Sequence, residues 1–326
     1  EHLIEHLEIE NASKLEEIDV TNLKSPKKRI DFRSNKWTFY FLSQPEINFI
    51  EHLLQENEIK PISNYAKAEV GMTTGSNKFF TVPNSVVEQF DLISYAKPMV
   101  GRSVQVTSNI FTRQDWEENV SNEARAFFLL FPSKDKLNQK ALSYLKEGEK
   151  EGLHKLYKCR IRDEWQTVPS AWVSDALFIR RNNIYPRLIV NEAGAYTTDT
   201  MHRVTIKKDN KLDTGRKINN KAFVASYYNS LSFAFAEISG RSHGGGVLEL
   251  MPNEVENILL PYDERNADLL EKIDKMLRAG KSIDEVLEMT DNIILKKHAG
   301  FSDEDIQMAN KIWKKLLKRR TTRRDS

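Results

Sequence analysis

The sequence is poor in the residues that support covalent or metal-based chemistry. Its 326 residues include a single cysteine, Cys159, which excludes an internal disulfide and any metal site built from several cysteines. The seven histidines are scattered, and none has the spacing of zinc ligands in a promising segment. No apolar run approaches the roughly 20 residues that a membrane-spanning helix needs. These absences predict a cytoplasmic protein without a metal site and without a membrane partner.

The motifs that hold nucleotide cofactors are also missing. No Gly-x-Gly-x-x-Gly turn is present, as a dinucleotide-binding fold would require. The stretch "VGMTTGSNKFF" (70–80) carries Gly71 and Gly75, but the Gly-Lys-Ser/Thr ending of a phosphate-binding loop does not follow. The glycines at 244–246 precede a strand-like segment, so no helix N-terminus would stand behind them to hold phosphate. We therefore predict no catalytic residue and no bound cofactor in this chain.

The composition is that of an ordinary globular protein. Hydrophobic residues make up 40% and charged residues 29%, and the formal net charge is only +2. With so small a net charge, any binding of nucleic acid must depend on where the charges lie. The chain does not begin with methionine, and we expect it to be a piece of a longer protein.

Three regions differ in pattern. Residues 1–35 are charged and weakly patterned, with a basic "KSPKKR" at 24–29, and predict a linker or the tail of a preceding domain. Residues 36–260 predict a strand-rich α+β domain with flanking helices, because short apolar runs alternate with turn residues. Its helices are expected after Pro45, near 136–157 and at 227–238. The expected strands are "WTFYFLS" (37–43), "RAFFLLF" (125–131), "AWVSDALFI" (171–179), "PRLIVN" (186–191), "HRVTI" (202–206), "AFVAS" (222–226) and "VLELM" (247–251).

Residues 261–326 predict a C-terminal helical segment. Apolar residues recur with helical spacing in "ADLLEKIDKMLR", and Ser282 with Glu285 has the form of a capping box. Ser302 with Asp305 is a weaker form of the same signal. The chain ends in "KKLLKRRTTRRDS", which is typical of a flexible basic tail that touches phosphates without specificity.

The most distinctive chemistry is a set of basic residues among aromatic and amide side chains. In "YKCRIRDEWQ" (157–166), an alternating strand would place Lys158, Arg160 and Arg162 on one face, where they could follow a phosphate backbone. The alternative is a solvated strand face neutralised by Asp163 and Glu164, and the spacing favours neither interpretation.

Two further segments carry candidate contacts. Arg241, Ser242 and His243 lie in the glycine-rich "ISGRSHGGG", where a backbone could approach a groove closely, although a plain mobile loop has the same composition. Arg181 and Asn182 lie in "RRNNIYPR", where arginine suits guanine and asparagine suits adenine.

The order of these segments resembles one family. "YAKAEVGMTTGSNKFFTV", "KPMVGRS", "YLKEGEKEGLHKLYKCRIRDEWQTVP", "RLIVNEAGA", "YYNSLSFAFAEISGRSHGGGVLELMPNEVENILLPY" and "FSDEDIQMANKIWKKLLKRR" follow one another as in the C-terminal target-recognition region of TaqI-like bacterial N6-adenine DNA methyltransferases. The resemblance covers roughly residues 60–320. It implies a sequence-specific duplex-DNA recognition module within a restriction-modification system.

The catalytic motifs of that family are not in this chain. Neither a Gly-rich S-adenosylmethionine loop nor an Asn-Pro-Pro-Tyr motif occurs, so the resemblance implies that the catalytic domain precedes these residues in the parent protein. S-adenosylmethionine is then the cofactor of the parent, and the expected partners are double-stranded DNA and the missing N-terminal domain. We expect the protein to be a monomer.

The resemblance also implies site residues. Gly71 and Gly75 should shape a turn, and Phe79 and Phe80 should pack in the core. The candidate DNA contacts are Ser76, Asn77, Lys78, Arg102, Lys158, Arg160, Arg162, Arg181, Asn182, Arg241, Ser242 and His243. Two alternatives stay open: the specificity part of a combined restriction-methylation polypeptide, and a protein-interaction module.

Overall fold

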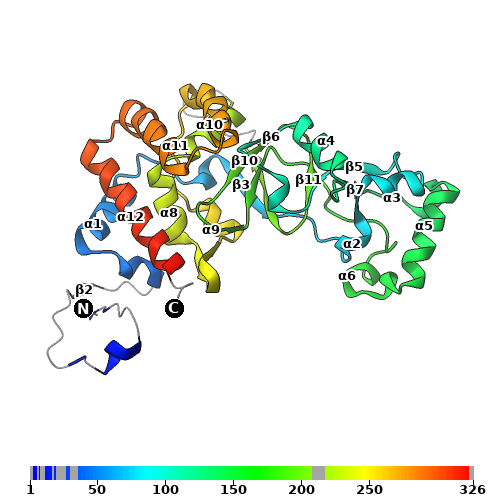
Figure 1. Cartoon of the computed structure of the whole chain (residues 1–326), viewed down its shortest axis with the longest axis horizontal. Coiled ribbons are helices and arrows are strands. Elements are labelled where there is room, and N and C mark those ends of the chain that lie inside the picture. The colour runs from blue at the N-terminus through cyan, green and yellow to red at the C-terminus, as the bar shows by residue number, and fades with distance from the viewer. Residues whose placement is uncertain are drawn as a thin grey trace.

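The chain forms an elongated molecule with two lobes that share a central sheet (Figure 1). The computed structural model describes residues 36–207 and 217–322 continuously, together with 3–5, 7, 12–16, 18–19 and 27–29. A helical lobe lies on one side of the central sheet, and a mixed lobe with a small sheet of its own lies on the other. The linker expected at 1–35 falls mostly outside the described residues.

The central sheet has five strands in the order β3-β12-β8-β10-β6. Its pairs are antiparallel except β10 with β6, which runs parallel. The bounds are β3 Ala66–Val70, β12 Met201–Ile206, β8 Ala176–Ile179, β10 Leu188–Asn191 and β6 Ile110–Phe111. The strands predicted at 171–179, 186–191 and 202–206 are therefore confirmed.

Both faces of this sheet are buried, each in a different hydrophobic core. On β8, Phe178 packs in the core of the helical lobe, and its neighbour Leu177 packs in the core of the mixed lobe. On β10, Leu188 packs in the core of the helical lobe and Ile189 packs in the core of the mixed lobe. Successive side chains of a strand point to opposite faces, so the continuous apolar runs "ALFI" and "LIV" supply both cores at once.

The helical lobe gathers helices from both ends of the described chain. They are α1 Gln44–Glu56, α7 Asn220–Tyr227, α8 Ser230–Ser239, α9 Pro252–Glu256, α10 Leu269–Arg278, α11 Ile283–Thr290 and α12 Asp303–Thr322, with short 3-10 turns at Trp37–Phe41, Ile62–Asn64 and Glu264–Asp268 and a π-helical turn at Asp291–His298. Trp313 of α12 is fully buried and meets Phe233 of α8 edge to face at 5.4 Å. The helices predicted after Pro45 and at 227–238 are confirmed, as are the capping boxes at Ser282 and Ser302.

Three local predictions for this lobe are wrong. "WTFYF" forms a 3-10 turn, which lets the adjacent Phe39 and Tyr40 both be buried, whereas a strand would send them to opposite faces. "AFVAS" belongs to helix α7, which begins where the Asn219 side chain accepts from two backbone amides. The expected basic tail is helical through Thr322, and Arg320 within it is only 2% exposed.

The mixed lobe is built around a four-stranded sheet of order β11-β5-β7-β4. Its strands are β11 Tyr196–Thr197, β5 Ala96–Val100, β7 Phe127–Leu129 and β4 Thr81–Val82. The helices around it are α2 Asn77–Phe80, α3 Asn84–Gln89, α4 Arg113–Ser121, α5 Gln139–Lys150 and α6 Tyr157–Arg160, with 3-10 turns at Ser103–Gln105, Lys134–Lys136 and Leu153–Lys155. Phe79 and Phe80 pack in its core, as predicted, and Phe79 stacks on Tyr144 at 4.5 Å.

Two smaller sheets complete the described structure. Strands β13 Arg241–His243, β14 Val247–Glu249 and β9 Arg181–Asn182 pair antiparallel in the order β13-β14-β9, with a 3-10 turn at Gly244–Gly246. Near the beginning of the chain, β1 Leu3–Ile4 pairs with β2 Lys28–Arg29, and Ala12–Leu15 forms a short 3-10 turn. The predicted α+β class is confirmed. No helix among the described residues is long and apolar enough to cross a membrane.

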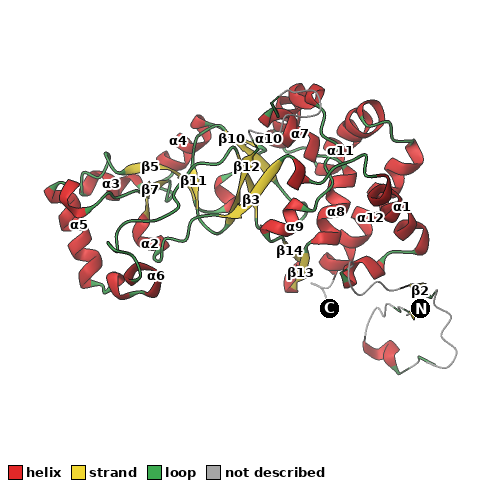
Figure 2. Cartoon of the chain, turned by 180° about the vertical axis from the view of Figure 1, so that it is seen from behind, coloured by secondary structure: helices red, strands yellow, loops and turns green. Residues whose placement is uncertain are grey.

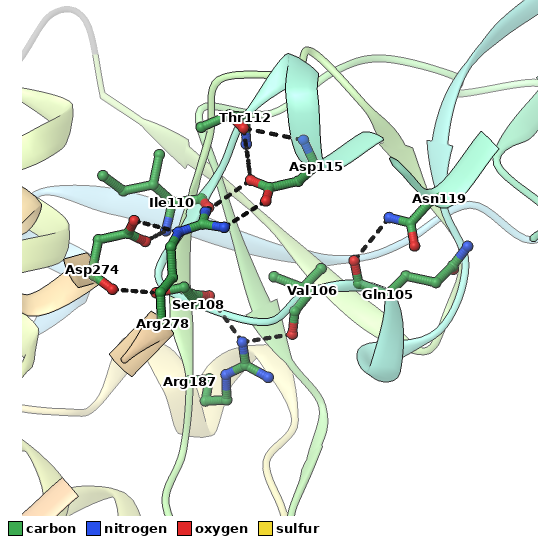
Figure 3. A network of polar contacts seen from close by, with 10 residues as sticks. All are labelled: Gln105, Val106, Ser108, Ile110, Thr112, Asp115, Asn119, Arg187, Asp274 and Arg278. Carbon is green, nitrogen blue, oxygen red and sulfur yellow. Dashed lines mark hydrogen bonds and ion pairs between the residues drawn. The ribbon is translucent and has the colours of Figure 1, made fainter. Parts of the chain in front are cut away.

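A polar network joins the two lobes beside the central sheet (Figure 3). Arg278 of α10 pairs with Asp115 of α4 at 2.6 Å and with Asp274 on its own helix at 2.6 Å. Arg278 also donates to the Ile110 carbonyl at 2.9 Å, and Asp274 accepts from the Ile110 amide at 3.1 Å. Because a guanidinium group presents its donors in a fixed fork, these bonds set the position of α4 relative to α10.

Substitution of Gly148 by alanine is predicted to destabilise the mixed lobe. A Cβ atom at this α5 position would lie 2.7 Å from the Phe79 ring and 2.9 Å from the Trp165 ring. The overpacking should outweigh the better helix propensity of alanine and lower the free energy of unfolding by about 1–3 kcal/mol. Urea unfolding measures this, with Gly244→Ala as the control, because a Cβ at Gly244 meets nothing within 4 Å. Equal stability of the two variants would contradict the packing described.

A second prediction concerns the pH dependence of stability. Burial raises the pKa of Asp291 to about 6, although the hydroxyl and amide of Ser230 both donate to its carboxylate. A raised folded-state pKa means that the stabilisation is complete below the unfolded value of 3.8 and is lost as the pH rises through about 6. The unfolding free energy of the native protein relative to Asp291→Asn should therefore fall by about 2 kcal/mol between pH ~4 and ~7. A difference that stays constant with pH would show that Asp291 titrates normally.

Candidate functional site

The predicted contact residues fall into two groups on different lobes and one isolated position. Figure 2 shows β13 and β14 at the lower edge of the helical lobe and α6 at the lower edge of the mixed lobe. Arg102 stands apart, immediately before the 3-10 turn Ser103–Gln105. The first group holds Arg181, Asn182, Arg241, Ser242 and His243, and the second holds Ser76, Asn77, Lys78, Lys158, Arg160 and Arg162.

In the first group, buried carboxylates neutralise the cations. Strand β14 lies between β9 and β13, and its register places Glu249 opposite both Arg181 and Arg241. Glu249 bonds to Arg181 at 3.0 Å and to His243 at 2.8 Å. Burial alone would raise the pKa of Glu249, but the bond from His243 and the arginine charges hold it below its usual value. Arg241 pairs instead with Glu254 at 3.0 Å.

Asn182 has a structural role in this small sheet. Its side chain is buried, with 4% exposed. The amide nitrogen donates to the Ile179 carbonyl at 2.7 Å, and the amide oxygen accepts from the Arg187 backbone at 3.1 Å. The next residue, Asn183, is the exposed amide of "RRNNIYPR".

In the second group, the predicted alternating strand does not form. Residues 157–160 form the short helix α6, not a strand, so Lys158, Arg160 and Arg162 do not share a strand face. The amides of Cys159 and Arg160 both donate to the Leu156 carbonyl at 2.9 Å, and Cys159 is the residue of this turn that is buried. Polar and apolar residues alternate here over too few positions to separate a strand from a single helical turn.

The loop 71–76 packs directly against α6. Gly75 has a φ of 89°, and a Cβ there would come within 2.8 Å of the Cys159 sulfur, so the position requires glycine for its conformation and for the close approach. At Gly71 a Cβ would lie 1.9 Å from the Thr198 carbonyl oxygen. The two glycines thus shape the turn, as the resemblance implied, and bring Ser76, Asn77 and Lys78 to the same end of the lobe as α6.

A cleft of about 590 Å³ lies between this loop and α6. Arg162 closes one side by donating to the Thr74 carbonyl at 2.7 Å. Arg203 of β12 forms another side, donates to the carbonyls of Ser170 and Val70 at 2.7 and 2.9 Å, and lies over the Trp172 ring at 3.4 Å. Burial lowers the pKa of both guanidinium groups, but arginine titrates so far above neutrality that both stay charged.

The cations around this cleft lack acidic partners. Among the described residues, no carboxylate lies within ion-pair distance of Lys158, Arg162 or Arg203, although Asp163 also lines the cleft and the charge of Glu69 acts on Arg203 from farther away. The same holds for Lys78 on α2 and for Arg160, whose guanidinium instead lies 5.8 Å from the Tyr157 ring. Arg203 is buried and Glu69, its cross-strand neighbour, acts on its charge, so the positive charge that a ligand could meet in the cleft comes mainly from Lys158 and Arg162.

Sequence reasoning missed Arg203. The available signal was an arginine in the middle of the apolar strand "HRVTI", because arginine is almost never fully buried without a specific partner. Cys159 gives no alternative chemistry, since burial raises the pKa of its thiol. Within the described part of the chain, no three histidine, cysteine or acidic side chains are grouped so that they could hold a metal ion.

The chain is similar to a curated methyltransferase and to a restriction endonuclease of known structure. The chain is 25% identical to the type II methyltransferase M.AccI of Acinetobacter calcoaceticus, over 89% of this chain and 55% of that protein. It thus spans about half the length of the curated relative that it matches. The type IIG restriction endonuclease BpuSI has a similar fold, with a TM-score of 0.52 and 10% identity over 88% of this chain and 34% of that one.

The family model that matches covers most of the chain. Residues 34–295 match the model of the C-terminal domain of the type II methyltransferase M.Eco57I. The predicted resemblance to the C-terminal region of a type II methyltransferase is confirmed at this level. The chain belongs to the family of the M.Eco57I C-terminal domain.

Proposed function

We propose that this chain is a sequence-specific duplex-DNA recognition module of a methyltransferase in a restriction-modification system. The parent would transfer a methyl group from S-adenosylmethionine to the exocyclic amine of an adenine that is turned out of the helix. The chemistry would reside in a catalytic domain outside this chain. We further propose that the module acts as a monomer in the cytoplasm.

The observation that carries the proposal is the set of unpaired cations around the cleft. Exposed ion pairs contribute little energy, but a cation that already has an acidic partner gains less from a phosphate than one that has none. Lys78, Lys158, Arg160 and Arg162 have no such partner among the described residues. DNA phosphates would supply the missing anions, and their binding would release condensed counterions.

The cleft does not suit the cofactor of the parent. S-adenosylmethionine carries a positive sulfonium group, which would face Lys158, Arg162 and Arg203 in this cleft. Repulsion between like charges in so confined a space disfavours that occupant. The unpaired cations therefore support an anionic ligand, in agreement with a cofactor site elsewhere in the parent.

One alternative also assigns DNA recognition to this chain. In it, the chain is the part of a combined restriction-methylation polypeptide that determines sequence specificity. The likeness to BpuSI concerns the fold and is compatible with both forms of the parent. The other alternative is that the chain is a protein-interaction module. No salt-dependent DNA binding is expected in that case.

The experiment that tests the proposal is selection of bound duplexes from a random DNA pool at two salt concentrations. Enrichment of one short motif that contains adenine is the expected result. Binding without enrichment would leave only a phosphate-binding surface in this chain. Failure to bind at low salt would favour the interaction module.

Removal of two exposed cations should change the salt dependence in a defined way. Lys158→Ala combined with Arg160→Ala should reduce the slope of log Kd against log salt by about 2, because each phosphate contact contributes about 0.9. Sequence preference should change little, since phosphate contacts carry no sequence information directly. Titrations of labelled duplex at several salt concentrations measure both quantities.

The matched control is Lys272→Ala. Lys272 is exposed on α10 in the other lobe, so this variant removes a positive charge without touching the cleft. Its salt slope should equal that of the native protein. If the double variant behaved in the same way, the cleft would not be the phosphate site.

A further inference from the structure

The turn that contains α6 exposes a cluster of large apolar side chains. Leu156 is 43% exposed, Tyr157 63% and Ile161 60%. No other stretch of six described residues exposes three large hydrophobic side chains. A single exposed residue of this kind needs no explanation, but a cluster of them indicates a surface that a ligand covers.

Cations lie between and beside these apolar side chains. Lys155, Lys158 and Arg160 are exposed, and no carboxylate of the described residues lies within ion-pair distance of them. Asp163, the nearest acid in the sequence, pairs with none of the three. The Lys158 Nζ atom and the Arg160 guanidinium carbon each lie 5.8 Å from the centre of the Tyr157 ring. The turn therefore suits a partner that is anionic and also offers apolar surface.

Buried contacts hold this turn in place. Cys159 is the buried residue of α6, and it packs against Gly75. Just after α6, Arg162 donates to the Thr74 carbonyl at 2.7 Å and to the Trp165 carbonyl at 3.1 Å. The exposed side chains thus project from a fixed backbone, so that little conformational entropy of the chain is lost when a ligand covers them.

The position and size of the turn suit one groove of duplex DNA. The turn lies at the lower edge of the mixed lobe (Figure 2), and residues 155–158 and 160–161 are all exposed. A helix with its side chains is about 10–12 Å across, which fits the major groove of about 12 Å and not the minor groove of about 6 Å. The major groove also presents the apolar methyl group of thymine between two rows of phosphates.

We propose that the α6 turn enters the major groove of duplex DNA, where Tyr157 and Ile161 contact thymine methyl groups while Lys158 and Arg160 pair with the flanking phosphates. The inference rests on the proposed function and deepens it. It assigns a contact that depends on sequence to a segment whose cations alone would grip only the backbone. Neither Tyr157 nor Ile161 was among the contacts predicted from the sequence.

An anionic membrane surface is the other partner that would attract cations beside apolar side chains. A helix that lies in a membrane interface needs a long amphipathic face, because its affinity grows with the apolar area that it buries. Helix α6 has four residues, Tyr157–Arg160. So short a turn suits a groove better than a membrane surface.

The test compares two duplexes that differ only in methyl groups. One is the duplex enriched from the random pool, and the other has the same sequence with deoxyuridine in place of every thymidine. Each adenine of the enriched motif stands opposite a thymine, so the motif contains methyl groups that can be removed. The native chain should bind the uracil duplex about fourfold more weakly for each methyl group that it contacts.

Substitution of the apolar side chains should remove this discrimination. Tyr157→Ser and Ile161→Ser should each bind the thymine duplex about fourfold to tenfold more weakly and lose part of the preference for thymine over uracil. Both side chains are exposed, so the cores stay intact. The salt slope should stay at the native value, because Lys158 and Arg160 remain. Tyr157→Phe keeps the ring and should retain the native preference.

The matched control is Ile93→Ser. Ile93 is 62% exposed between α3 and β5 and does not line the cleft beside α6. This variant removes the same kind of side chain from the surface of the same lobe. It should bind both duplexes as the native chain does.

Three results would overturn the proposal while leaving DNA recognition by the chain intact. The first is equal binding of the two duplexes by the native chain. The second is a lower salt slope in Tyr157→Ser, because the ring would then serve only to place the two cations beside it. The third is binding of phosphatidylserine vesicles that Tyr157→Ser abolishes without any change in DNA affinity. If the native chain enriched no motif, the proposed function would fail, and this assignment would fail with it.

Discussion

The burial of the central sheet on both faces is the constraint on which the rest of the structure depends. Strands β8 and β10 send alternate side chains into two separate cores, so neither lobe could keep its core without them. A shift of the pairing by one residue would move Phe178 and Leu177 into each other's cores, which differ in the volume to be filled. Both lobes therefore fix the register of the same few residues. The Arg278 network adds a polar tie at one edge, but the shared sheet determines how the lobes are joined.

The candidate binding cleft lies where chain segments leave this sheet. The cationic cleft begins at the end of β3, where the Gly71 amide donates to the Met201 carbonyl at 3.0 Å, and Arg203 belongs to β12 itself. Binding residues on loops are effective when a rigid scaffold positions them. A sheet clamped between two cores is such a scaffold, and it holds Gly71 and Arg203 in fixed positions around the cleft.

Much of the fold could be predicted from the sequence, because a long run of apolar residues with a regular period identifies a strand or a helix by itself. The strands at 176–179, 188–191 and 201–206 and the helix after Ser43 have clear apolar periodicity or caps. One error came from a run in which every residue is buried. "AFVAS" is apolar on all sides, so periodicity could not separate a helix from a strand, and only the Asn219 cap distinguishes them. The alternation around Arg160 spans too few residues, and tertiary packing of Cys159 against Gly75 determines the helical turn there.

The candidate site was less predictable than the fold, because the charge that a ligand meets depends on which acids fold back onto which bases. In the sequence, Arg181 and Arg241 look as available as Arg160. In the structure, Glu249 and Glu254 lie beside the first two, and no described carboxylate lies beside the third. Arg320 makes the same point more strongly, since a residue from an apparently basic tail is buried with Glu237 and holds the loop at 183–184. A net charge of +2 therefore says little about binding. An anionic partner is favoured by the local excess of positive charge around one cleft. That excess exists only once the chain has folded.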